Sequence, residues 1–215
     1  MLELGIKALL SYLIGSLNGS LLLGKLLGGP DVRTVGSGNA GGTNALRARG
    51  KWFALGVVII DVGKGYLAVA LVPGMALPGV AYDPSLSATW LALTCAGAAV
   101  VGHCYPLWFG FTGGKGGATT VGVLLALSPV VLLPGLVTWV LVVATTGFVG
   151  LATMLAAAAM PVFVALTRFA DHVELFVFLL LLALFIVYTH RENVGRMLRR
   201  EENRMAGMML LRRPR

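Results

Sequence analysis

The chain has 215 residues, of which 57% are hydrophobic and only 12% are charged. Soluble domains carry about 25% charged residues, and a chain with so few has too little polar surface to cover a globule in water. The composition therefore argues against a soluble enzyme, a disordered protein and a DNA-binding module. It indicates a polytopic, all-α membrane protein. Nor does the net charge of +8 predict a nucleic-acid partner, because in a membrane protein the basic residues report topology.

Three apolar spans are predicted in the first half of the chain, since a helix needs about 20 apolar residues to cross a bilayer. They lie at about 4–27, 52–77 and 87–109. In the first, Gly15-x-x-x-Gly19 offers a flat face for close helix contact. In the second, Asp61 and Lys64 lie three residues apart and share a helix face. Because charges are costly inside a bilayer, these two either form a structural pair or brace a functional site.

An uncharged run of fifty residues, 118–167, is predicted to fold back on itself. As a single helix it would be about 75 Å long, more than twice the thickness of the hydrocarbon core. Pro129 and Pro134 are expected to flank one turn, and Thr145-Thr146-Gly147 marks another. The run then holds three helices: one that ends near Ser128, followed by 131–144 and 149–167.

A last span at 175–189 brings the total to seven, with five as the alternative if the long run holds one re-entrant or tilted element. The spans are expected to form one membrane-embedded domain over residues 1–215. A basic tail, 190–215, follows the last span, and we interpret its arginines as contacts to anionic membrane lipids. The N-terminus has no basic region followed by a cleavage site, so no signal peptide is predicted.

The basic residues predict the orientation of these spans. With seven spans, one side of the membrane receives 28–51, 110–117, 145–148 and 190–215. That side and the span ends facing it hold fourteen of the 17 basic residues: Lys25, Arg33, Arg47, Arg49, Lys51, Lys115, Arg191, Arg196, Arg199, Arg200, Arg204, Arg212, Arg213 and Arg215. The positive-inside rule then places this side in the cytoplasm and the N-terminus outside.

Three segments on the cytoplasmic side combine flexible backbone or small polar groups with a cation. They run from Gly36-Ser37-Gly38-Asn39 to Thr43-Asn44 and Arg47, from Gly102-His103 to Gly113-Gly114-Lys115-Gly116, and from His190-Arg191-Glu192-Asn193 to Arg196. Glycines allow backbone N–H groups to point at an anion, and arginine and lysine supply the positive charge that a phosphate needs. One shared phosphate site at the inner face of the membrane is therefore predicted.

Histidines and cysteines add little further chemistry. His190 opens a polar segment three residues before Asn193 and is the candidate acid–base group, whereas His103 is interpreted as a structural hydrogen-bonding residue. Cys95 and Cys104 have no second pair, so neither a disulfide framework nor a zinc site is expected. We predict no cofactor and no metal.

The three segments resemble, in chain order, the signatures of the bacterial acyl-phosphate:glycerol-3-phosphate acyltransferases, the PlsY family. The first is similar to Gly-Ser-Gly-Asn-Pro-Gly-Ala-Thr-Asn-x-x-Arg, and the second to Gly-His-x-Phe-Pro followed by Gly-Gly-Lys-Gly. The third is similar to His-Arg-x-Asn-Ile-x-Arg-Leu-x-x-Gly-x-Glu. Departures from these patterns include Ala40 for proline, Gly42 for alanine and Arg200 for glycine. Between the fifth and sixth spans, Gly150 stands where many relatives have serine.

The resemblance implies transfer of an acyl group from acyl phosphate to the 1-hydroxyl of glycerol 3-phosphate, which yields lysophosphatidic acid at the cytoplasmic face of a bacterial inner membrane. It implies catalytic roles for Ser37, Lys115 and His190. It also implies substrate contacts by Gly36, Gly38, Asn39, Thr43, Asn44, Arg47, Gly113, Gly114, Gly116 and Asn193. In this family an oxygen of the acyl phosphate is thought to accept the hydroxyl proton, with His190 as the alternative base.

Two features of the sequence bear on this function. No His-x₄-Asp acyltransferase motif is present, because the fifth residue after His103 is Trp108 and the fifth after His190 is Gly195. A transporter or flippase for an organic phosphate remains the alternative, since it would also suit seven spans and cytoplasmic cations. Against it, the two halves show no inverted repeat and no paired broken helices.

Overall fold

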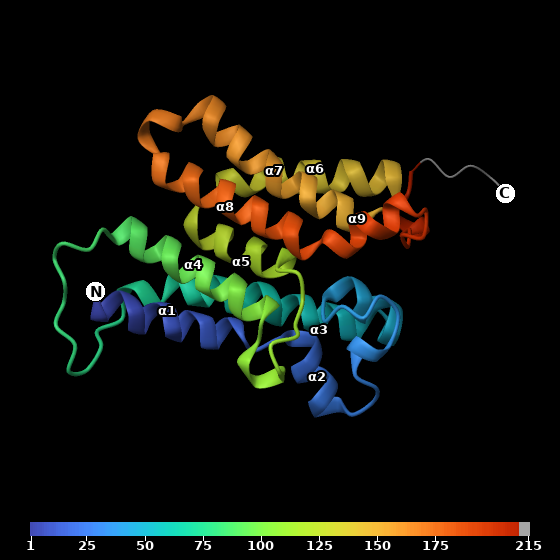
Figure 1. The fold of residues 1–215 in the computed structure, drawn as a ribbon, viewed down its shortest axis with the longest axis horizontal. Coiled ribbons are helices and arrows are strands. Elements are labelled where there is room, and N and C mark those ends of the chain that lie inside the picture. The colour runs from blue at the N-terminus through green and yellow to red at the C-terminus, as the bar shows by residue number, and fades with distance from the viewer. Residues whose placement is uncertain (211–215) are drawn as a thin grey trace. The chain divides into compact units, whose positions relative to one another are not determined.

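The structure is a computed structural model that describes residues 1–210, and over this range the chain forms helices and loops without a β-strand (Figure 1). Arg212, Arg213 and Arg215 of the predicted basic tail lie outside the described residues. The chain divides into two compact units, Met1–Ser128 and Pro129–Arg215, which we call the first and second units. The single domain predicted for 1–215 stays a prediction.

The first unit contains five α-helices, α1 (Leu2–Gly15), α2 (Gly19–Leu27), α3 (Gly42–Ala70), α4 (Ala88–Cys104) and α5 (Gly117–Leu127). Small residues allow their backbones to approach closely. A Cβ atom on Gly15 would collide with the backbone of Ala99 in α4, and one on Gly19 would lie 2.8 Å from the carbonyl oxygen of Val57 in α3. Both glycines allow close packing as predicted, but they belong to different helices and face different partners, so Gly15-x-x-x-Gly19 does not form one continuous helix face.

The first predicted span is not one continuous helix. α1 ends at Gly15 and α2 begins at Gly19, and the two helices are bent by 49°. Asn18 is the N-cap of α2, and its side-chain oxygen accepts hydrogen bonds from the backbone N–H groups of Ser20 and Leu21. An Asn side chain that satisfies the first N–H groups of a new helix favours a break at this point.

The second half of the segment 28–51, between the first two predicted spans, is helical, because α3 begins at Gly42. At Gly50 the backbone has φ +82°, so this residue interrupts the helix and separates a short polar part from the long apolar part. Glycine adopts this conformation without steric cost. Hydropathy identifies only the apolar part as helix.

The second unit contains α6 (Pro129–Thr146), α7 (Val149–Thr167), α8 (Val173–Thr189) and α9 (Arg191–Leu198) among the described residues. The helix predicted at 149–167 is confirmed, but Pro134 lies inside α6 instead of flanking a turn. Proline removes one backbone hydrogen bond, and helices within membranes tolerate this. α8 and α9 are bent by 53°, and His190 lies at the bend. Each unit therefore contains one bent helix pair, so the expectation that the two halves have no paired broken helices is wrong.

All seven predicted spans coincide with apolar helices of the described chain. Four helical stretches are long and apolar enough to cross a bilayer, and the two bent pairs, α1 with α2 and α8 with α9, raise the number to six. α5, with 11 residues, is shorter than a bilayer crossing requires. Seven spans therefore stay a prediction.

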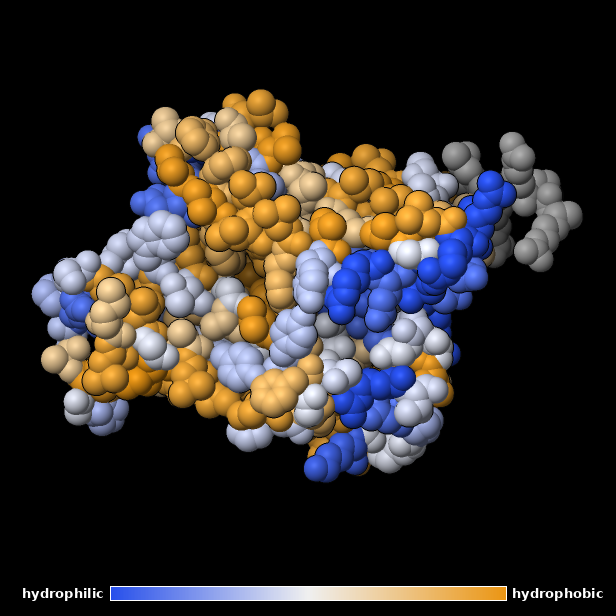
Figure 2. Space-filling model, in the orientation of Figure 1, coloured by the Kyte–Doolittle hydropathy of each residue, from blue (hydrophilic) through white to orange (hydrophobic). Residues whose placement is uncertain are grey.

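Many apolar side chains lie on the outside of these helices, as lipid-facing side chains do. In α6, Leu133, Val137 and Val140 are each more than half exposed. Figure 2 shows hydrophobic residues over much of the visible sides of the helices. Such a surface suits contact with lipid and not with water.

Candidate functional site

Asn44 holds the first glycine-rich segment in shape. Its Oδ1 accepts a hydrogen bond from the backbone N–H of Ser37 at 3.0 Å, and its Nδ2 donates to the carbonyl oxygens of Val32 (2.7 Å) and Val35 (3.0 Å). Asn44 is only 1% exposed. Gly36 has φ +60°, and a Cβ there would collide with the Asn44 amide oxygen. The Asn44 side chain therefore braces the loop, and glycine is required beside it.

Both glycine-rich segments lead directly into a helix whose first turn has no side-chain cap. Gly41 is the N-cap of α3 and Gly116, with φ +89°, is the N-cap of α5; neither helix has a side-chain cap hydrogen bond. The first N–H groups of a helix have no partner within the helix, and with the helix dipole they attract anions. Two helix starts of this kind lie in the first unit.

The cations predicted for phosphate binding belong to these same two regions. Arg47 is exposed on the polar part of α3, and Lys115 is half-buried immediately before the N-cap of α5. Ser37, Asn39 and Thr43 are half-buried in the first segment or in the first turn of α3, and Gly38 has φ +70°.

The second segment folds back onto the end of α4. The backbone N–H groups of Gly113 and Gly114 donate to the carbonyl oxygens of Cys104 (3.0 Å) and His103 (3.1 Å). A Cβ on Gly114 would collide with Nε2 of the His103 ring and would lie 2.9 Å from the carbonyl oxygen of Ala40. The two predicted segments therefore come together at Gly114 and Ala40, and glycine is required there for packing.

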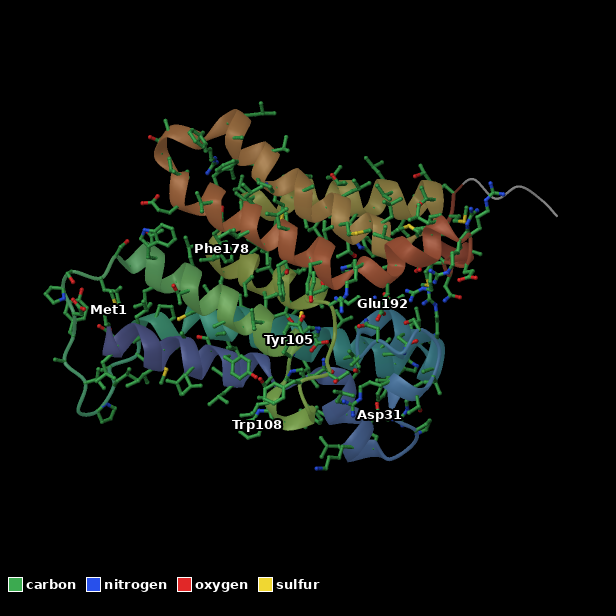
Figure 3. The ribbon with its side chains drawn as sticks, viewed as in Figure 1. Met1, Asp31, Tyr105, Trp108, Phe178 and Glu192 are labelled. Atoms are coloured by element: carbon green, nitrogen blue, oxygen red, sulfur yellow. The ribbon has the colours of Figure 1, made fainter. Side chains whose placement is uncertain are left out.

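Arg33 links the two segments as well. Its guanidinium forms a two-pronged ion pair with Asp31, the residue labelled in Figure 3, and its Nη1 donates to the carbonyl oxygens of Phe109 (2.9 Å) and Thr112 (3.1 Å). The same pairing lowers the pKa of the Asp31 carboxyl, because the ionised form receives the hydrogen bonds of Arg33. Sequence reasoning counted Arg33 only as a topology signal. The proximity of Asp31, two residues earlier, is a weak signal of the pairing.

The third segment belongs to the second unit. His190 is 6% exposed, and its Nδ1 lies 2.8 Å from the carbonyl oxygen of Ile186. A carbonyl oxygen only accepts, so Nδ1 donates this hydrogen bond, which orients the imidazole ring.

Asn193 is oriented within the second unit by a carboxylate. Its Nδ2 donates to Glu202 Oε1 at 2.8 Å, and Arg196 Nε donates to Glu202 Oε2 at 2.7 Å. Gly150 packs against Asn193 so closely that a Cβ there would lie 2.7 Å from Nδ2. A side chain at position 150, where many relatives have serine, would require Asn193 to move.

The other departure in this segment also has a structural consequence. Arg200 has φ +61°, a left-handed conformation that explains why glycine is usual at this position. α9 nevertheless ends at Leu198, and the backbone N–H of Glu201 donates to the carbonyl oxygen of Arg196 at 2.8 Å. α9 therefore ends before this position although glycine is absent from it.

No metal site is apparent in residues 1–210, where no group of three or more His, Cys, Asp and Glu side chains could hold an ion. Metal-independent chemistry stays a prediction.

The chain is similar over almost its whole length to known acyltransferases. The family model described as glycerol-3-phosphate acyltransferase matches residues 6–200. The glycerol-3-phosphate acyltransferase of Rhodospirillum rubrum is 40% identical over 204 residues, which cover 95% of this chain and 92% of the relative. That of Synechococcus elongatus is 42% identical over 198 residues, with 92% of each chain covered.

A solved structure agrees with this similarity. A crystal structure of PlsY, an integral membrane glycerol 3-phosphate acyltransferase, in its glycerol 3-phosphate form, matches with a TM-score of 0.81 and 31% identity. The match covers 94% of this chain and 95% of the other. The lysophosphatidic acid form of PlsY matches with a TM-score of 0.78 and 30% identity, covering 94% of each chain.

Proposed function

Because the chain belongs to the glycerol-3-phosphate acyltransferase family, we propose that it transfers an acyl group to the 1-hydroxyl of glycerol 3-phosphate and so forms lysophosphatidic acid. The name of the family model, the names of the relatives and the two PlsY forms support this reaction. We further propose that the acyl donor is an acyl phosphate.

One structural observation carries the proposal of two phosphate-bearing substrates. α3 and α5 both begin after a glycine N-cap that makes no side-chain cap hydrogen bond; Lys115 directly precedes the N-cap of α5, and Arg47 lies in the second turn of α3. Each helix start can bind an anion with its N–H groups, and each cation adds charge. Two such places suit a reaction in which two phosphates must be held despite their mutual repulsion.

In the proposed reaction the 1-hydroxyl oxygen of glycerol 3-phosphate attacks the acyl carbon of the acyl phosphate. The new ester C–O bond forms, the bond from the acyl carbon to the phosphate oxygen breaks, and inorganic phosphate leaves with the hydroxyl proton. An acyl phosphate is a mixed anhydride with a good leaving group, so the protein has mainly to position both substrates and stabilise their charges.

Roles follow for the individual residues. Ser37, with the backbone of Gly38 and Asn39, helps to hold the acyl phosphate, and Arg47 and Lys115 bind substrate phosphate. The remaining predicted contacts to substrate come from Gly36, Thr43 and Gly116. Those predicted for the backbone N–H groups of Gly113 and Gly114 are corrected, because these groups donate to the carbonyl oxygens of Cys104 and His103. The Asn44 side chain serves this site through the loop that it braces.

In the second unit, His190 and Asn193 orient glycerol 3-phosphate. The leaving phosphate takes the proton of the attacking hydroxyl. His190 is the alternative base if the phosphate does not.

We also propose that the site faces the cytoplasm from a bacterial inner membrane, with seven spans and the N-terminus outside. Support comes from the fourteen basic residues on one side of the seven-span topology. An acyl donor partitions into lipid and glycerol 3-phosphate is water-soluble, so a site at the boundary between lipid and water gives both substrates access.

The first experiment is an assay of purified protein in detergent with a long-chain acyl phosphate and glycerol 3-phosphate, without added metal. A parallel reaction contains acyl-CoA in place of the acyl phosphate. Lysophosphatidic acid formed from acyl phosphate alone is the expected result. Product from acyl-CoA alone would overturn the proposal that acyl phosphate is the donor. The absence of product from folded protein would favour transport or lipid binding.

A further inference from the structure

A buried cluster of three ionisable side chains lies beneath the glycine-rich segments of the first unit. Asp61, Lys64 and His103 are 0%, 5% and 2% exposed, respectively. Lys64 Nζ lies 2.9 Å from Asp61 Oδ1 and 2.9 Å from His103 Nδ1, and it donates to the carbonyl oxygen of Leu17 at 3.1 Å. Asp61 Oδ1 also accepts a hydrogen bond from the backbone N–H of Gly19 at 2.9 Å.

The geometry assigns the protons of this cluster. A lysine ammonium has three N–H donors and no acceptor, and three acceptor positions surround Lys64. His103 Nδ1 must therefore accept, and the ring proton is on Nε2. The second close approach, 3.3 Å between Nδ1 and Asp61 Oδ1, is then a contact between two acceptors and not a hydrogen bond.

One set of hydrogen bonds connects the cluster to the first glycine-rich segment. Asp61 and Lys64 bind the backbone on either side of Asn18, at the break between α1 and α2. Asn18 is 0% exposed, caps α2 with its oxygen and donates its Nδ2 to the carbonyl oxygen of Ala40 at 3.1 Å. The cluster therefore fixes the backbone around Asn18, and the side chain of Asn18 is hydrogen-bonded to Ala40.

A second set of contacts connects the cluster to the second glycine-rich segment. The His103 ring, hydrogen-bonded through Nδ1 to Lys64, has its Nε2 against Gly114, where a side chain would collide with it. The carbonyl oxygen of Ala40 borders the same point. Both sets of contacts therefore end at Ala40 and Gly114, where the two segments meet.

We propose that Asp61, Lys64 and His103 are positioning residues, which set the two glycine-rich segments, and with them the starts of α3 and α5, at the distance that phosphate binding requires. The inference rests on the proposed function, since it concerns how that site is held. It gives a role in the reaction to a charged pair that lies within a predicted membrane span, where ionisable residues are costly.

The first unit provides a matched control. Lys7 and Glu3 also form a buried ion pair within one helix, with Nζ 2.7 Å from Oε1 and side chains 4% and 7% exposed. Their further partners are the carbonyl oxygen of Pro73 and the backbone N–H of Asp83, outside both glycine-rich segments. This pair has the same chemistry without contact to the site.

The test compares the double variants Asp61→Asn/Lys64→Met and Glu3→Gln/Lys7→Met, because removing both charges leaves no unpaired ion in either pair. We expect the first variant to raise KM for acyl phosphate about tenfold, because the first glycine-rich segment is proposed to hold that substrate and a misplacement of about 1 Å at a site can cost up to about 100-fold. We expect the control variant to leave KM unchanged. A loss of folded protein alone would lower the apparent kcat of either variant without changing KM.

Hydrogen–deuterium exchange of segments 36–41 and 110–116 provides a readout that does not depend on activity. Exchange should accelerate in Asp61→Asn/Lys64→Met and not in the control. If wild-type protein forms no product, the proposed function fails, and the exchange result still decides whether the cluster positions these segments. Unchanged KM and unchanged exchange in Asp61→Asn/Lys64→Met, or equal changes in the control variant, would overturn the proposal.

Two substitutions of His103 sharpen the test. His103→Asn keeps an acceptor near the position of Nδ1, whereas His103→Leu is of similar size and removes it. We expect His103→Leu to raise KM, as the double variant does. We expect His103→Asn to keep KM close to the wild-type value. Equal KM values for the two variants would contradict the assigned hydrogen bond.

Discussion

Replacing Gly150 by alanine tests the role of Asn193 directly. A Cβ on Gly150 would lie 2.7 Å from Asn193 Nδ2 and 2.8 Å from its Cγ, whereas ordinary contacts of a Cβ begin at 3.4 Å. Asn193 must therefore move by the difference, about 0.7 Å. Because its Nδ2 is hydrogen-bonded to Glu202 at 2.8 Å, this movement also strains the contact that orients it.

We expect Gly150→Ala to lower kcat about tenfold, because a 1 Å misplacement of a positioning group can cost about 100-fold. The variant should also lose about 1–3 kcal/mol of stability to overpacking. The assay is lysophosphatidic acid formation by purified protein, with thermal unfolding measured on the same samples.

Gly5→Ala is the matched control, because Gly5 is also helical and a Cβ there meets nothing within 4 Å. That variant should keep full activity and gain up to about 1 kcal/mol from higher helix propensity. Full activity together with unchanged stability in Gly150→Ala would refute the contact and the role assigned to Asn193.

Four further predictions follow from the same structure. Lys115→Ala and Arg47→Ala should each lower activity at least about tenfold in protein that still inserts into membranes, because each removes a charge that binds phosphate; near wild-type turnover in either would exclude that residue from the site. His190→Asn should lower kcat substantially, and retention of most of kcat would exclude His190 as the base. The pKa of Asp31 is lowered in the folded protein by its hydrogen bonds with Arg33, so the stability from this pair is present above the ordinary pKa of aspartate and is lost as pH falls through the lowered value. The difference in unfolding temperature between wild type and Asp31→Asn should therefore shrink below about pH 4, and a constant difference from pH 6 to pH 3 would contradict this. Arg200→Gly should raise stability by about 1 kcal/mol, because glycine relieves the left-handed backbone strain at this position, and a lower unfolding temperature would show that the Arg200 side chain contributes more than this strain costs.

Hydropathy predicts the apolar helices well because a bilayer imposes one dominant requirement on a spanning segment. The helix at 149–167 has the predicted bounds, and the long uncharged run divides into three helices as its length requires. The errors lie where hydrogen bonds override hydropathy. Asn18 starts a new helix inside a continuous apolar stretch. The polar residues 42–49 form the first part of α3, which hydropathy does not identify as helix.

The candidate site was predictable as a set of segments, not as a set of contacts. From the sequence, glycines, Arg47 and Lys115 are predicted to lie in two segments on one side of the membrane, and in the first unit these segments come together. It does not show that the side chain of Asn44 is bonded to the loop backbone, or that Arg33 bridges to Phe109 and Thr112. Those partners lie up to 79 residues apart in the chain, so no local pattern reports them.

Membrane residence, the positions of the apolar helices, the three motif segments and the family resemblance all follow from the sequence alone, because each depends on composition or on local residue order. Only the tertiary structure shows why Gly114 and Gly150 are glycines and what Asp61 and Lys64 contact. The reason is physical. Close packing and buried hydrogen bonds depend on distances between helices, and those distances are set only when the whole unit is folded.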